Sequence, residues 1–169
     1  MKTLNQIDKN TIIYIVNEIT RHHGIKNVPP VKLGRLTYLL WLEYASLQPG
    51  YEFPKNSPMA NMRFINYERG PAEVLSSNNY YEIQSEIISG RVPNFSQTMF
   101  AANEKVRLNH AFETVRNCYS NHRTEDLCYF IQHTLPTCLF KPVIAPLQIN
   151  NQEFLQEVQS FIKHRHKLK

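Results

Sequence analysis

The segment between two proline breaks constrains the fold of this chain most strongly. Pro29-Pro30 and Pro49-Gly50 bound it, and proline is tolerated in the first turn of a helix but not in its interior. The spacing therefore predicts a helix that begins at about Pro30 and ends at about Leu47. Its apolar positions are Leu33, Leu36, Leu39, Leu40, Trp41, Leu42 and Tyr44. A helix with apolar residues on so many sides is expected to lie at the centre of the fold.

Further segments show the apolar spacing of helices. Helices are expected over residues 11–23, 72–76 and 103–119, from Thr124 towards Pro136, and from Asn150 onward. The segment Tyr80 to Ile88 fits either a strand or a helix, and a short extended piece is expected around residues 62–67. Because 169 residues fit one domain, we expect a mainly α, single compact helical domain of five or six helices with one or two short extended segments.

Two finer features of these helices are also predicted. Asn10 is expected to cap the first helix and Gly24 to end it. In the helix over residues 103–119, the buried face is expected to include Val106, His110, Ala111 and Val115.

The excess of positive charge is concentrated at the C-terminus. The chain has 19 Lys and Arg residues against 14 Asp and Glu, and four of the basic residues lie in segment 163–169, which has no acid. The rest of the chain is therefore nearly neutral, which is not typical of a nucleic-acid-binding domain. We expect residues 1–162 to form the helical domain and residues 163–169 to be a basic C-terminal tail, solvated and frayed. A tail that contacts phosphate or an acidic partner is the alternative.

The sequence favours a cytoplasmic protein that does not enter a membrane. The N-terminal residues lack the apolar region of a signal peptide, and the longest apolar stretch, residues 36–45, is too short to span a bilayer. The three cysteines begin only at residue 118, and an odd number of them is not typical of a disulfide-stabilised secreted fold.

A series of cysteine and histidine residues is the clearest candidate for chemistry. It comprises Cys118, His122, Cys128, His133 and Cys138. Cys118 and His122 are four residues apart and could share a helix face, as two zinc ligands require, and a Cys–His nucleophile pair could come from the same residues. The gaps match no common zinc template, however, and we expect the cysteines to pack as small apolar residues. The sequence therefore predicts no catalytic residue and no cofactor, with a zinc-binding domain as an alternative.

Arginine and tyrosine residues gather in the middle of the chain. The candidate contact residues are Arg63, Tyr67, Arg69, Tyr80 and Tyr81, which are expected to be exposed around the Gly70-Pro71 turn. Both residue types are enriched at protein–protein interfaces, although basic residues among aromatic ones also bind nucleic acid. Because the body of the domain is nearly neutral, we expect a protein partner, with nucleic acid as the alternative.

Three stretches of the chain form an ordered pattern. They are Lys32-Leu33-Gly34-Arg35-Leu36-Thr37-Tyr38, then Phe64-Ile65-Asn66-Tyr67-Glu68-Arg69-Gly70-Pro71, and finally Asp126-Leu127 followed by His133 and Pro136. In order and spacing they resemble the Panacea family of antitoxin domains, which includes the SocA antitoxin. That family carries Lys-Leu-x-Lys-Leu-x-Tyr, Phe-x-Ala-Trp-x-x-Gly-Pro and a late Leu…His…Pro pattern. Arg35, Asn66 and Tyr67 depart from it, Gly34 is an unusual residue inside a helix, and the resemblance covers roughly residues 10–162.

The resemblance implies a protein that is not an enzyme. Panacea domains act as antitoxins that neutralise toxins by direct protein contact, and many related domains occur in prophages and other mobile elements. We therefore expect an antitoxin-like protein-binding module with a cognate toxin as its partner. A nucleic-acid-associated regulator from a mobile element is the alternative.

The matching residues have the character of a scaffold as much as of a binding surface. They are Lys32, Leu33, Arg35, Leu36, Tyr38, Phe64, Tyr67, Gly70, Pro71 and His133. Lys32 and Arg35 are three residues apart, so both can flank the apolar stripe and reach an acidic surface or the carbonyl groups of a helix C-terminus. The ring of Tyr38 can be buried while its hydroxyl group keeps a hydrogen bond.

Overall fold

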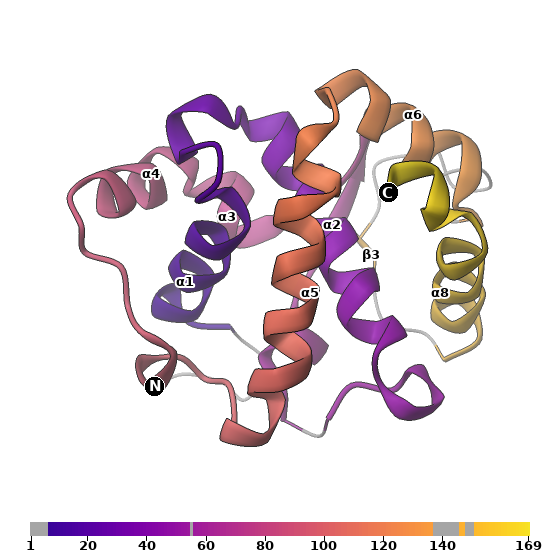
Figure 1. Ribbon diagram of the computed structural model, residues 1–169, viewed down its shortest axis with the longest axis horizontal. Helices are drawn as coiled ribbons and strands as arrows, with labels where there is room; N and C mark the ends of the chain where they lie inside the picture. Colours follow the sequence, from indigo (N-terminus) through magenta and orange to yellow (C-terminus); the bar gives the residue numbers. More distant parts are fainter. Residues whose placement is uncertain (1–6, 55, 137–145, 148–150) are drawn as a thin grey trace.

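The computed structural model describes residues 7–54, 56–136, 146–147 and 151–169 (Figure 1). The helices are α1 (Lys9–Thr20), α2 (Pro30–Ser46), α3 (Val74–Asn78), α4 (Tyr80–Ile88), α5 (Lys105–Asn117), α6 (Thr124–Thr134) and α8 (Asn151–His164). The strands are β1 (Phe64–Tyr67), β2 (Gly70–Glu73) and β3 (Pro146–Leu147). Short 3-10 helices are η1 (Ile25–Asn27), η2 (Pro49–Tyr51), η3 (Pro58–Asn61), η4 (Phe95–Gln97), η5 (Ala102–Glu104), η6 (Tyr119–Asn121) and η7 (Arg165–Leu168). The prediction of a mainly α single domain is confirmed, and no helix in the described ranges has the length and apolarity to cross a membrane.

Helix α2 lies at the centre of the fold, as predicted. Every residue from Leu33 to Ala45 is buried, and the helix contacts β2, α1, α5, α6 and α8. In Figure 1 it runs behind α5, with α1 on one side and α8 on the other. Its buried polar groups are partnered, since the Tyr38 hydroxyl donates to the Glu157 carboxylate of α8 and Trp41 Nε1 donates to the Met59 carbonyl at 2.8 Å.

The three strands form an antiparallel sheet in the order β2-β1-β3. Phe64 of β1 lies opposite Glu73 on one side and opposite Leu147 on the other. The extended segment around Phe64 is confirmed, whereas the prediction of a helix from Ala72 is wrong. Pairing with β1 keeps the chain extended as far as Glu73, whose carboxylate then caps α3 by accepting hydrogen bonds from the amides of Leu75 and Ser76.

Other local predictions are settled by the contacts of α1, α4 and α5. Residues Tyr80–Ile88 form a helix. Helix α1 begins before Asn10, because the Asp8 carboxylate caps it by accepting from the Thr11 amide at 2.8 Å. On α5, Val106 and His110 are exposed, contrary to prediction, and the face toward the core is formed by Leu108, Ala111, Phe112 and Val115. Helix α1 ends at Thr20, earlier than predicted, and Gly24 does not end it: with φ of 79° and ψ of 137° it lies outside the left-handed helical conformation and precedes η1.

The C-terminal segment is packed against the domain, so the expectation of a solvated, frayed tail is wrong. Helix α8 continues to His164, and Leu168 of η7 is buried. Arg165 Nη1 lies 2.5 Å from the carboxylate of Glu43, a residue of α2 that is only 2% exposed. The Lys169 ammonium group lies 3.8 Å from the same carboxylate. A buried acid on the central helix therefore binds the basic tail. The predicted capping role of Asn150 lies outside the described residues.

Candidate protein-binding surface

A buried arginine joins the first two stretches of the sequence pattern. Arg35, on α2, is 3% exposed and extends to the turn between β1 and β2. Its Nε donates to the Arg69 carbonyl at 2.9 Å, and its Nη1 donates to the carbonyls of Gly70 and Pro71 at 3.0 and 2.7 Å. Three N–H···O bonds from one planar cation fix the backbone of the turn. Arg35 therefore does reach backbone carbonyls, but those of a hairpin and not those of a helix C-terminus.

Two glycines allow this arrangement. A Cβ atom at Gly34 would lie 2.8 Å from Ala72 Cβ, so the missing side chain lets α2 approach β2 directly. Gly70 has φ of +110°, a conformation that residues with side chains rarely adopt. A Cβ atom at Gly70 would also lie 3.2 Å from Arg35 Nε. The unusual glycine inside the central helix thus has a packing reason.

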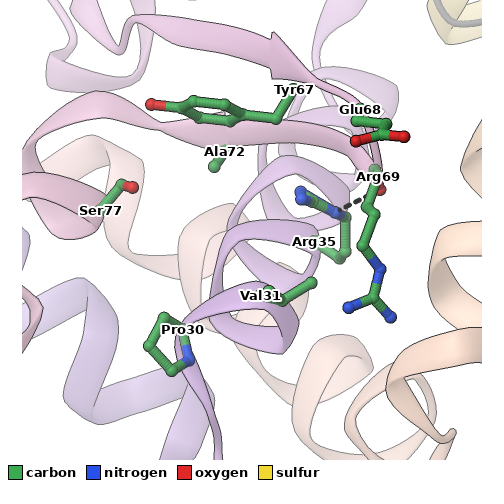
Figure 2. A pocket seen from close by; sticks show the side chains of 8 residues that line it. All are labelled: Pro30, Val31, Arg35, Tyr67, Glu68, Arg69, Ala72 and Ser77. Atoms are coloured by element: carbon green, nitrogen blue, oxygen red, sulfur yellow. Dashed lines mark hydrogen bonds between the residues drawn. The ribbon is translucent and has the colours of Figure 1, made fainter.

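A pocket opens between the hairpin and the start of α2, and its volume is about 420 Å³. It is lined by Pro30, Val31, Arg35, Tyr67, Glu68, Arg69, Ala72 and Ser77. Figure 2 shows the Tyr67 ring along one side of the pocket and the Arg69 side chain extending along another, beside Arg35 and Val31. Tyr67 is half-buried, whereas Glu68 and Arg69 are exposed. We call Tyr67, Glu68, Arg69 and this pocket the hairpin surface.

The third stretch of the pattern lies close to the hairpin surface. The Gln132 side chain of α6 donates to the Glu68 carbonyl. The next residue, His133, is exposed; its ring stacks on that of Tyr129 with 4.0 Å between centroids, and its Nδ1 lies 3.0 Å from the Tyr129 carbonyl. The segments that carry all three stretches therefore meet at one hairpin, the third of them through Gln132, which is not itself a residue of the pattern.

Most of the remaining pattern residues are scaffold. Leu33, Leu36, Tyr38 and Phe64 are buried in the core, and the Tyr38 ring packs edge-to-face on Phe64 with 5.2 Å between centroids. Lys32 is half-buried, and burial lowers the pKa of its ammonium group.

The candidate contact residues do not form one surface. Arg63 and Tyr81 are exposed, with Tyr81 at 76%, but neither lines the pocket. The prediction that Tyr80 is exposed is wrong: it is 6% exposed and its hydroxyl donates to the Val28 carbonyl at 2.6 Å. Tyr81, the next residue of α4, is exposed, and its ring meets the buried Tyr80 ring edge-to-face with 5.2 Å between centroids. Tyr67 and Arg69 are the candidates that the structure brings together.

The cysteine and histidine series is not gathered into a site in the part of the chain that the structure describes. Cys128 is buried, Cys118 is half-buried and both are free thiols. His122 Nε2 lies 2.6 Å from the Leu168 carbonyl, so this histidine contacts the C-terminal segment. No three His, Cys, Asp or Glu side chains within the described ranges are grouped to hold a metal ion. Cys138 lies outside those ranges.

Sequence reasoning missed six residues of this region. Pro30 and Val31 line the pocket from α2, Ala72 and Ser77 line it from β2 and α3, Glu68 forms the turn, and Gln132 ties α6 to it. Their proximity depends on chain segments about a hundred residues apart, and no local pattern signals it.

No family model matches the chain, and no curated protein or solved structure matches it.

Proposed function

We propose that this chain is a non-catalytic, antitoxin-like module that neutralises a cognate toxin protein by direct contact through the hairpin surface. The observation that carries the proposal is the triple hydrogen bond from buried Arg35 to the turn that bears Tyr67 and Arg69. A turn fixed in this way loses little conformational entropy when a partner binds, which favours affinity. The resemblance of the three converging stretches to Panacea antitoxins supports the choice of a toxin as partner.

The composition of the hairpin surface also supports a protein ligand. Tyrosine and arginine are the residue types most often responsible for binding energy at protein interfaces. Exposed Arg69 and half-buried Tyr67 lie next to apolar pocket walls contributed by Val31 and Ala72. The proposal assigns no catalytic residue and no cofactor, and it places the module in the cytoplasm.

Three buried carboxylates have structural partners, which fits a binding module. Glu43, Glu104 and Glu157 each accept a hydrogen bond from a tyrosine hydroxyl group, those of Tyr119, Tyr44 and Tyr38. Burial raises the pKa of the Tyr44 and Tyr119 hydroxyl groups, so both remain protonated donors at neutral pH.

The test is an affinity pull-down of the tagged full chain from its native host, read by mass spectrometry. We expect a protein to be recovered in stoichiometric amount, to be toxic when expressed alone, and to be neutralised when the chain is co-expressed. Arg69→Glu should abolish both recovery and neutralisation. Lys105→Glu is the matched control, because Lys105 is exposed at the start of α5 and does not line the pocket.

Three outcomes would overturn the proposal. They are recovery of nucleic acid in place of a protein, recovery of a protein that is harmless when expressed alone, and an Arg69→Glu variant that neutralises the toxin as well as the unchanged chain does.

A further inference from the structure

The pocket of the hairpin surface is bordered by a charged side chain, that of Arg69, which is not paired within the described residues. The Arg69 guanidinium group forms no hydrogen bond or ion pair with any residue that the structure describes. Its backbone carbonyl accepts a hydrogen bond from Arg35. In Figure 2 the Arg69 side chain extends along the pocket beside Arg35, so two guanidinium groups border the same space.

Glu68 is the one acid among the residues that line the pocket, and it is exposed at the turn. The first turn of α2 contributes Pro30 and Val31 to the wall, and the positive end of its helix dipole adds to the field. The Arg69 guanidinium group and the positive end of α2 therefore favour an anion, and a carboxylate is the anionic group that a protein partner would offer.

The rest of the pocket wall is apolar. Pro30, Val31, Ala72 and the ring of Tyr67 supply it. A volume of about 420 Å³ is larger than one carboxylate needs and lies within the range of ligand-binding pockets. An acidic side chain together with a neighbouring apolar side chain would fill it.

We propose that the pocket accepts an Asp or Glu side chain of the partner protein, with an adjacent apolar residue packed on Tyr67 and Val31. The carboxylate pairs with the Arg69 guanidinium group, and the backbone of Arg69 is held beside the pocket because Arg35 binds its carbonyl. This inference rests on the proposed function for the identity of the partner, but the recognition chemistry can be tested without it.

The experiment uses random heptapeptides displayed on phage and selected on the tagged full chain. Enriched sequences are synthesised, and their affinities are measured by fluorescence anisotropy. We expect Asp or Glu beside an apolar residue in the enriched peptides. Arg69→Gln should weaken binding about tenfold, as for an interface arginine that carries binding energy. Glu68→Gln should strengthen peptide binding about threefold, because it removes the negative charge that repels the acidic peptide. If Glu68 had only a structural role, its replacement would not strengthen binding.

A steric pair of variants locates the binding site. Ser77→Trp places a large side chain at the pocket and should weaken binding at least tenfold. Asn78→Trp is the matched control, because Asn78 is the next exposed residue of α3 and does not line the pocket. Circular dichroism checks that each variant is folded.

Enriched peptides without an acid would overturn the inference, and so would an absence of enrichment. Binding that is unchanged by Arg69→Gln and Ser77→Trp would do the same. If the Ser77→Trp variant neutralised the toxin as well as the unchanged chain does, the proposed function would stand and the pocket would be rejected as the acceptor. Failure of this inference can therefore be distinguished from failure of the proposed function.

Discussion

A Cβ atom on Gly34 would lie 2.8 Å from the Cβ atom of Ala72, closer than real Cβ atoms approach one another. At Gly34, helix α2 therefore approaches strand β2 with only backbone facing the Ala72 methyl group. A glycine inside a helix costs about 1 kcal/mol relative to alanine. This cost is offset by the short separation, which brings Arg35, the next residue, within reach of the hairpin carbonyls.

Gly34→Ala should destabilise the protein even though alanine favours helix. We expect the free energy of unfolding to fall by about 1–2 kcal/mol, because overpacking of about 1–3 kcal/mol exceeds the gain in helix propensity. Urea denaturation followed by circular dichroism measures the change. Adding Ala72→Gly should restore part of the loss, since it removes the methyl group that the new side chain would meet. A Gly34→Ala variant more stable than the unchanged chain would contradict the packing argument.

Gly70→Ala should be costly for two reasons. Gly70 has φ of +110°, and a Cβ atom there would lie 3.2 Å from Arg35 Nε. We expect a loss of about 2–3 kcal/mol in the free energy of unfolding. Gly90→Ala is the control, because Gly90 also has positive φ, +76°, but nothing lies within 4 Å of its Cβ position. Equal losses in the two variants would show that backbone strain alone matters and that the contact with Arg35 does not.

The sequence predicted the central helix because its signals are local. Pro30 and Pro49 mark its limits, and its apolar residues repeat within a few positions of one another. The exposure of Val106 and the burial of Tyr80 depend on which neighbouring element covers each helix face. Helical spacing indicates that a face exists, but the direction of that face is set by tertiary contacts.

The candidate site was only partly predictable for the same reason. Arg35, Tyr67 and Gly70 belong to stretches that stand out in the sequence, and the structure brings these stretches together. A glycine is needed at position 34 because of the contact with Ala72, which lies 38 positions away in the sequence. The C-terminal tail pairs with Glu43, a single acid within an apolar helix. A charged tail by itself predicts only solvation, so the sequence did not indicate this contact.

Replacement of Arg35 tests whether it holds the hairpin. Arg35→Met keeps much of the length of the side chain but leaves three carbonyls without their donor, so we expect a loss of about 2–4 kcal/mol in the free energy of unfolding. Arg35→Lys should cost less, about 1–2 kcal/mol, because an ammonium group can still donate to some of these carbonyls. Urea denaturation measures both values.

Hydrogen exchange locates the effect of the Arg35 variants. Amides of residues 64–73 should exchange faster in Arg35→Met, and those of α5 should change little at low denaturant. Arg63→Met is the control, since Arg63 is exposed and a surface change is expected to stay within about 0.5 kcal/mol. Uniformly faster exchange across the whole chain would mean that Arg35 supports global stability and has no particular role at the turn.

The C-terminal segment should contribute to stability through Arg165 and Glu43. Arg165→Ala leaves the buried Glu43 carboxylate with weaker partners, chiefly the Tyr119 hydroxyl at 3.2 Å and the Lys169 ammonium group at 3.8 Å. Since Arg165 is itself partly exposed, we expect a loss of about 1–3 kcal/mol in the free energy of unfolding, below the value for a fully buried pair. Lys167→Ala, at an exposed position of the same segment, should change the free energy of unfolding by less than about 0.5 kcal/mol.

A double-mutant cycle of Arg165→Ala with Glu43→Gln tests the pair itself. The losses in the two single variants should sum to more than the loss in the double variant, because each single variant removes the same interaction. Additive losses would show that Arg165 and Glu43 act independently and that the tail is held by the burial of its apolar residue instead.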